Sequence, residues 1–172
     1  MTRNRRYRTE YEQQLDSKKF DFGLIFKFVS LNAVYCFLIY LVRNILLQAI
    51  LDSPRHKLGN DIISLHEVHN RGAAFNLFEN QPDLIIAASF FAVLIISFIV
   101  FTASTKLSHS LVSAMACLTS GIIMNVVDRT MYGFVIDYIQ IGIIPGLPIF
   151  NLADVLIVAG AIGIIACVIN KK

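Results

Sequence analysis

The chain has 172 residues, of which 56% are hydrophobic and only 16% are charged. A soluble domain of this size carries about a quarter charged residues, so the composition indicates one membrane domain rather than a soluble one. The formal net charge is +3. Its basic N-terminal residues alternate with acids and lack a set of aromatic platforms, which argues against nucleic-acid binding.

We divide the chain into a charged, cytoplasmic N-terminal tail, 1–23, and a membrane domain, 24–172. The domain contains four apolar stretches, each close to the ~20 residues that cross a bilayer as a helix. These stretches are 24–50, 84–104, 110–127 and 152–169. The first is too long for the apolar part of a cleaved signal and has no small-residue cleavage site after it, so we expect it to remain as an anchor. The sequence therefore predicts an all-α membrane fold with four transmembrane helices.

The distribution of lysine and arginine predicts the orientation, because cytoplasmic segments of membrane proteins carry the excess of these residues. With the N-terminus inside, nine basic residues are cytoplasmic and four lie in the outer loops. The cytoplasmic set is Arg3, Arg5, Arg6, Arg8, Lys18, Lys19, Lys106, Lys171 and Lys172, and the outer set is Arg55, Lys57, Arg71 and Arg129. We therefore expect both termini in the cytoplasm.

The larger outer loop, 51–83, contains a stretch at 61–69 with β-branched residues and alternating character, followed by a turn at 70–72. This pattern predicts a small extracytoplasmic β element in the first outer loop. Within it, His66 and His69 flank Glu67 in a segment one residue short of the zinc-protease motif. Residues three apart on a strand point to opposite faces, so we expect no metal site here.

Ionisable groups at membrane depth are costly and are candidates for function by default. Here they are Arg43, Asp128, Arg129, Asp137 and Asp154. The predicted topology places the three aspartates at the outer interface, with Asp137 in the short loop of 128–151 that joins the last two helices. When two carboxyl groups lie close together, one pKa rises and the pair shares a proton. Such a pair supplies the base and the acid that peptide hydrolysis needs.

Structural roles compete with catalysis at two of these acids. Asn151 has the residue type of a helix N-cap and Asp154 the N3 position, so a capping role for Asp154 is at least as well supported by local sequence as a catalytic one. Asp128 and Arg129 favour an ion pair that caps the third helix. Asp137 stands alone in an apolar, strand-like stretch, where a structural role is harder to find. No histidine lies near this cluster, which weakens a nucleophile–histidine triad.

Four segments together resemble the lipoprotein signal peptidase (signal peptidase II) family, across about 64–163 and in the family's order. They are HNRGAAF (69–75), NVVDR (125–129), GFVIDYI (133–139) and PIFNLAD (148–154). The resemblance implies an aspartic protease of the bacterial inner membrane, with its active site on the extracytoplasmic side. It implies cleavage of the signal peptide from a prolipoprotein directly before a diacylglyceryl cysteine.

By motif match, the resemblance implies that Asp137 and Asp154 are the catalytic pair. It gives supporting roles to Asn125, Asp128, Arg129 and Asn151, and places Asn70 and Gly72 in a surface β element that cradles the substrate. It implies no metal or organic cofactor. The implied partners are the lipid-modified precursor, membrane lipid and a cyclic peptide antibiotic inhibitor, globomycin.

The first helix departs from the family pattern, which carries an Asp-Gln-x-Thr-Lys-like stretch there. The corresponding residues are IYLVR (39–43), so that Arg43 stands where the family has lysine and the acid is missing. Met124 replaces a glycine usual in the third helix. Two alternatives therefore stay open: a weak or silent homologue that binds lipoproteins, and a transporter that uses the aspartates as an ion or proton relay.

Overall fold

The computed structural model describes residues 20–52, 56–58, 62–72, 78 and 81–170. Most of the charged tail, and several basic residues used above to infer orientation, lie outside the described residues. Within them, four helices are long and apolar enough to cross a membrane. They are α2 (Phe22–Asp52), α3 (Pro82–Ala103), which the 3-10 turn η2 (Ser104–Lys106) extends, α4 (His109–Tyr132) and α5 (Leu152–Ile169). The prediction of a four-helix, multi-pass membrane protein is confirmed.

The third of these helices, α4, is longer than its apolar stretch and runs past Val127 to Tyr132. It ends where Gly133 adopts a left-handed conformation with φ 80° and donates its N–H to the carbonyl oxygen of Arg129. Asp128 and Arg129 were expected at the outer end of this helix, as a pair that caps it, but the helix continues past both to Tyr132. Both side chains are buried instead, and both have partners from other elements.

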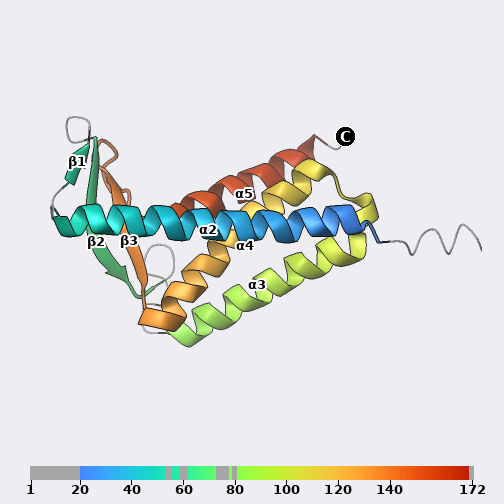
Figure 1. Ribbon diagram of the computed structural model, residues 1–172, viewed down its shortest axis with the longest axis horizontal. Coiled ribbons are helices and arrows are strands. Elements are labelled where there is room, and N and C mark those ends of the chain that lie inside the picture. Colours follow the sequence, from blue (N-terminus) through green and yellow to red (C-terminus); the bar gives the residue numbers. More distant parts are fainter. Residues whose placement is uncertain (1–19, 53–55, 59–61, 73–77, 79–80, 171–172) are drawn as a thin grey trace, which may run out of the picture.

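Helix α4 lies at the centre of the bundle and packs against α2, α3 and α5 (Figure 1). Its closest neighbour is α5, and glycines make the approach possible. A Cβ atom at Gly160 would collide with the backbone nitrogen of Leu118, and one at Gly121 with the carbonyl oxygen of Ala153. The beginning of α5, which carries Asp154, is therefore held against the C-terminal half of α4.

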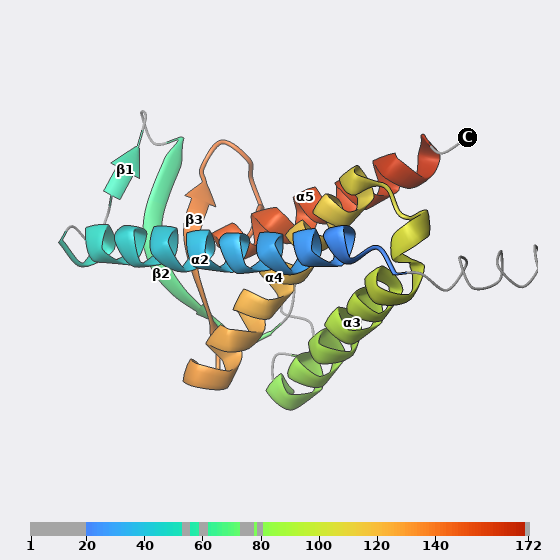
Figure 2. The ribbon, with the colours of Figure 1, turned by 45° about the vertical axis from the view of Figure 1, so that its right-hand side comes forward.

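A three-stranded antiparallel sheet lies across one end of the bundle, beside the C-terminal ends of α2 and α4 (Figures 1 and 2). Its order is β1 (His56–Leu58), β2 (Ile63–Asn70) and β3 (Val135–Ile141). The β element expected in the first outer loop is thus present as β1 and β2. The connection between α4 and α5 adds β3, in which Asp137 pairs with Val68 of β2 and Val135 pairs with Asn70 of β2. Asp137, expected in the connection 128–151 within a strand-like stretch, lies on this strand.

The sheet is fixed to the helices by its own small apolar core. Ile136 and Tyr138 of β3 and Leu65 of β2 are buried with Ile50, near the end of α2. The first four residues of β3 are all buried, because this strand lies between β2 and the helices. Burial of β3 removes Asp137 from water, and this sets the chemistry of its carboxyl group.

Candidate active site

Asp154 lies in the first turn of α5, at a capping box. The Asn151 side-chain oxygen accepts from the Asp154 backbone N–H at 3.1 Å, and Asp154 Oδ2 accepts from the Asn151 backbone N–H at 3.0 Å. The predicted cap is confirmed. The other carboxylate oxygen, Oδ1, accepts from Asn125 Nδ2 of α4 at 2.8 Å. The cap therefore leaves Asp154 facing the centre of the polar cluster, so a structural and a chemical role are compatible.

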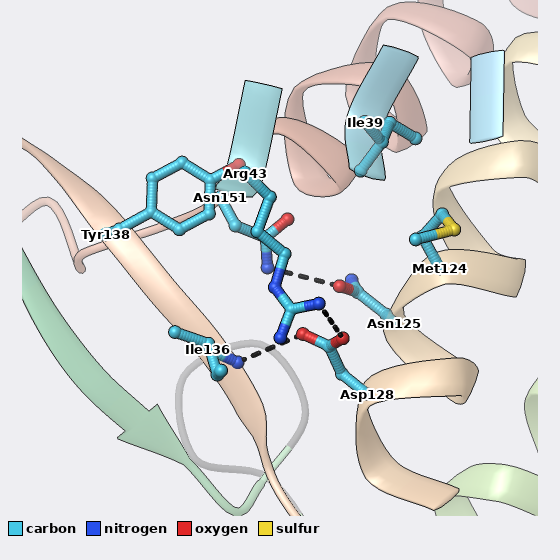
Figure 3. A pocket seen from close by; sticks show the side chains of 8 residues that line it. All are labelled: Ile39, Arg43, Met124, Asn125, Asp128, Ile136, Tyr138 and Asn151. Carbon is cyan, nitrogen blue, oxygen red and sulfur yellow. Dashed lines mark hydrogen bonds and ion pairs between the residues drawn. The ribbon is translucent and has the colours of Figure 1, made fainter. Parts of the chain in front are cut away.

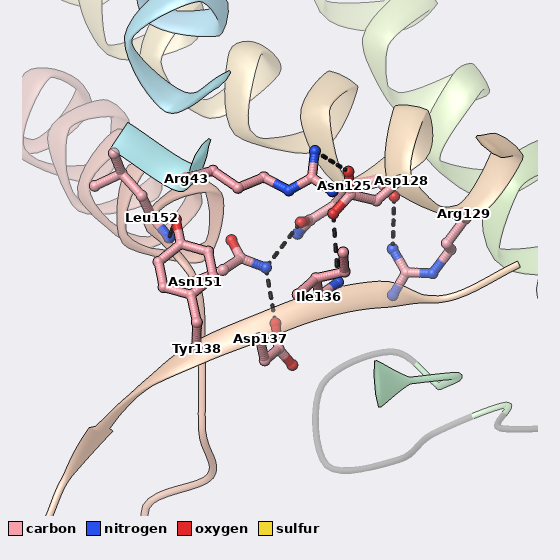
Figure 4. A network of polar contacts seen from close by, with 9 residues as sticks. All are labelled: Arg43, Asn125, Asp128, Arg129, Ile136, Asp137, Tyr138, Asn151 and Leu152. Carbon is pink, nitrogen blue, oxygen red and sulfur yellow. Dashed lines mark hydrogen bonds and ion pairs between the residues drawn. The ribbon is translucent and has the colours of Figure 1, made fainter. Parts of the chain in front are cut away.

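Asp137 is only 2% exposed, and both of its oxygens accept a hydrogen bond from an amide. Oδ1 accepts from Asn151 Nδ2 at 2.8 Å, and Oδ2 accepts from Asn70 Nδ2 at 2.9 Å. Figure 4 shows the Asn151 amide between β3 and α4, where it also donates to Asn125 Oδ1 at 3.1 Å. Asn151 thus contacts both aspartates, and the structure brings together the two residues that the resemblance implied as a pair.

Burial raises the pKa of Asp137 from 3.8 to about 6. The hydrogen bond from Asn70 opposes this rise in pKa, and the negative charge of Asp154 adds to it. The bond from Asn151 and the positive charge of Arg129 oppose it more weakly. Asp137 is therefore a carboxyl group that binds a proton much closer to neutral pH than an exposed aspartate does.

The orientations of the two asparagine amides are set by backbone groups. The Gly72 N–H donates to Asn70 Oδ1 at 3.0 Å, so the Asn70 Nδ2 group is the one that faces Asp137. Gly72 is buried, and its carbonyl oxygen accepts from Arg129 Nη2 at 2.6 Å. Arg129 therefore holds the end of β2 against α4 and contacts Asp137 only through Gly72 and Asn70.

Asp128 lies apart from the pair and contacts a different arginine from the one expected. Its Oδ1 is 3.3 Å from Arg43 Nη1 of α2, and its Oδ2 accepts from the Ile136 N–H at 3.3 Å. Arg129 instead binds the carbonyl oxygens of Gly72 and Asn125. The expected Asp128–Arg129 ion pair at a helix end is replaced by these bonds because α4 continues past both residues.

A small cavity lies beside these groups (Figure 3). Its lining combines the polar cluster with apolar residues from α2, α4 and β3, namely Ile39, Arg43, Met124, Asn125, Asp128, Ile136, Tyr138 and Asn151. Tyr138 is a contact that sequence reasoning missed. Its hydroxyl accepts from the Leu152 N–H at 3.2 Å and so ties β3 to the first turn of α5, a link that leaves no local sequence signal.

The histidine segment of β2 holds no cluster of metal ligands. Across the described ranges, no group of three or more histidine, cysteine, aspartate or glutamate side chains is placed to hold a metal ion. His69 Nε2 lies 2.7 Å from Glu67 Oε1, and the His69 ring stacks on Phe134 at 3.9 Å between centroids. The first contact lies within β2, and the second joins β2 to the residue directly before β3.

Comparison with known proteins shows which family the chain resembles. The model of the family described as signal peptidase (SPase) II matches residues 33–170. A lipoprotein signal peptidase of Caldicellulosiruptor bescii is 36% identical over 111 residues, which are 64% of this chain and 69% of that protein. Another, of Clostridium tetani, is 32% identical over 125 residues, 68% of this chain and 80% of that protein.

The fold is also found in solved structures of bacterial membrane enzymes. One has a TM-score of 0.72 at 19% identity and covers 90% of this chain and 95% of its own. A second has a TM-score of 0.66 at 20% identity and covers 90% and 98%. At such identities these structures support the fold alone. The family match spans every site residue from Arg43 to Asp154, and the chain therefore belongs to the signal peptidase II family of peptidases.

Proposed function

We propose that this protein cleaves the signal peptide from lipid-modified prolipoproteins, directly before the diacylglyceryl cysteine, with Asp137 and Asp154 as its catalytic pair. The observation that carries this assignment is Asn151, which donates to Asp137 and forms the capping box with Asp154. One side chain thereby positions two carboxyl groups from a strand and a helix. The family membership of the chain supplies the reaction class.

In the proposed reaction, Asp154 acts as the base and Asp137 holds the proton, because burial raises the pKa of Asp137. Asp154 takes a proton from water as the water oxygen attacks the scissile carbonyl carbon, and Asp137 protonates the carbonyl oxygen. When the tetrahedral intermediate collapses, the C–N bond breaks. Asp154 then gives its proton to the amine, and the diol returns a proton to Asp137. Asn70, Asn125 and Asn151 hold the two carboxyl groups during these transfers.

We place the protein in the bacterial inner membrane with both termini cytoplasmic and the site at the extracytoplasmic interface. The excess of basic residues in the segments assigned to the cytoplasm supports this orientation. A lipid-bearing substrate suits a site at this level, since its acyl chains can stay in the bilayer while the peptide bond reaches the carboxyl groups. Membrane lipid and a globomycin-like cyclic peptide are the further partners that we propose.

The test is cleavage of a diacylated precursor by the purified protein and by Asp137→Asn and Asp154→Asn. Each substitution keeps the side-chain shape but removes a proton-transferring group, so we expect a loss of about 10³-fold or more in kcat for each. Asp83→Asn is the matched control, because Asp83 is an exposed acid in the first turn of α3. It should cleave at the rate of the unsubstituted protein.

Cleavage at the normal rate by either site variant would overturn the catalytic assignment. The same assay separates the peptidase from its two rivals, since a transporter or a silent lipoprotein-binding homologue yields no product. We expect globomycin to stop cleavage by the unsubstituted protein.

A further inference from the structure

Arg43 is a cation of α2 in an unusually apolar setting. The residue is only 7% exposed, and the adjoining cavity wall includes Ile39 and Met124. A guanidinium removed from water is costly unless it is paired. Two contacts offset this cost. Nη1 lies 3.3 Å from Asp128 Oδ1, and the guanidinium carbon lies 5.3 Å from the centre of the Tyr132 ring.

Asp128 carries this contact onward to β3. Its second oxygen, Oδ2, accepts the backbone N–H of Ile136, the residue directly before Asp137 (Figure 3). Ile136 is itself buried, so its N–H needs a partner within the protein. The carboxylate of Asp128 therefore has one oxygen on α2 and the other on the backbone of the strand that bears Asp137.

We propose that Arg43 is a positioning residue that acts on Asp137 through Asp128 and the backbone of Ile136. Figure 4 shows the arrangement, with Arg43 on one side of Asp128 and β3 on the other. Arg43 touches neither aspartate of the pair and takes no part in proton transfer. The positive charge of Arg43 keeps the Asp128 carboxylate in place as the acceptor for the Ile136 N–H. This contact sets the distance between β3 and α4. This inference rests on the proposed function, because it assigns Asp137 to the reaction.

The first test compares kcat and KM for three variants. Arg43→Met keeps the length of the side chain but leaves Asp128 without its cation, and we expect kcat to fall about 10- to 100-fold with KM little changed. Arg43→Met combined with Asp128→Asn removes both charges, and the new amide oxygen can still accept from Ile136. We expect this double variant to recover at least half of the decrease in log kcat that Arg43→Met causes. Lys27→Met removes another cation of α2, one that is bonded to the His109 carbonyl oxygen, and should leave kcat unchanged.

The second test does not depend on activity. Hydrogen exchange of the segment 134–138 should accelerate about 10-fold in Arg43→Met and return toward normal in the double variant, while α5 stays protected. If Arg43→Met does not accumulate in the membrane, the double variant lacks both the Arg43 and the Asp128 charge and can be used instead. Its kcat and its hydrogen exchange then decide alone.

Normal kcat or unchanged exchange in Arg43→Met would overturn the proposal, as would a double variant no better than the single one. Absence of cleavage by the unsubstituted protein would instead overturn the proposed function, and the exchange measurement would still decide the role of Arg43.

Discussion

Asp154 lies in the first turn of a helix, whereas Asp137 lies within a strand, and the two carboxyl groups are held in different ways. Asp154 is half-buried, and one of its partners is the backbone N–H of Asn151, three residues away. Asp137 is almost fully buried, and both of its partners are side chains, Asn70 and Asn151. Local helix geometry supplies part of the support of Asp154, together with Asn125 of α4, whereas both partners of Asp137 come from tertiary packing. Substitutions near only one of the two aspartates can therefore separate their contributions.

The largest effect, a loss of stability, is expected from Gly160→Leu in α5, the helix that carries Asp154. A side chain at Gly160 meets the backbone of α4 at Leu118, so α5 must move away from its partner helix. We expect a loss of about 3 kcal/mol or more in the free energy of unfolding, measured by thermal or denaturant unfolding in detergent.

Ala159→Leu is the control for this variant, since Ala159 is the exposed neighbour on the same helix. It adds comparable bulk on the outward face and should change stability by less than about 0.5 kcal/mol. Equal destabilisation by both variants would mean that bulk in α5, rather than the contact with α4, limits stability.

The next largest effect is expected from substitution of Asn151, the residue that contacts both aspartates. Asn151→Ala removes the helix cap and the amide that donates to Asp137. We expect a loss of about 100-fold in kcat and of about 1 kcal/mol in stability. Asn151→Ser restores a good capping residue but is too short to reach Asp137. It should regain the stability and not the activity. Recovery of both by serine would show that the cap alone accounts for the role of Asn151.

The difference between local and long-range contacts explains how much of the site could be predicted from the sequence alone. The cap at Asn151 and Asp154 was predictable because its two residues are three positions apart and belong to a known helix-start pattern. The bond from Asn70 to Asp137 joins residues 67 positions apart. Its geometry depends on the pairing of β2 with β3, and the strand-like stretch around Asp137 did not reveal which strand it pairs with. The motif resemblance named both aspartates, but it could not say which groups hold them.

The charged residues near the end of α4 show the same limit. Asp128 and Arg129 are adjacent, and adjacency suggested a mutual ion pair. Successive residues on a helix point in different directions, so each binds a different element. Asp128 meets Arg43 of α2, and Arg129 meets Gly72 at the end of β2. Arg43 was visible in the sequence as a cation at membrane depth in the first apolar stretch, but only the packing of α2 on α4 identifies its partner.

The smallest of these effects, and the most specific to Asp137, is expected from Asn70→Leu. The Asn70 amide lowers the pKa of Asp137 by donating to Oδ2. Its loss should therefore raise this pKa further above 6. If Asp137 must be protonated to act as the acid, activity falls as pH rises through its pKa. The descending limb of the pH–rate profile should then move to higher pH, with a loss of about 10-fold in kcat at the optimum.

Ser64→Ala is the matched control for this shift. Ser64 bonds to Gln140 across the same two strands, at the end of the ladder away from Asp137. Its loss weakens the pairing of β2 with β3 without removing a donor from the carboxyl group, so the profile should keep its position. If the descending limb of the pH–rate profile moved to lower pH in Asn70→Leu, that limb would belong to a group other than Asp137. A shift of the same size in Ser64→Ala would mean that strand pairing, rather than the amide, sets the proton affinity of Asp137.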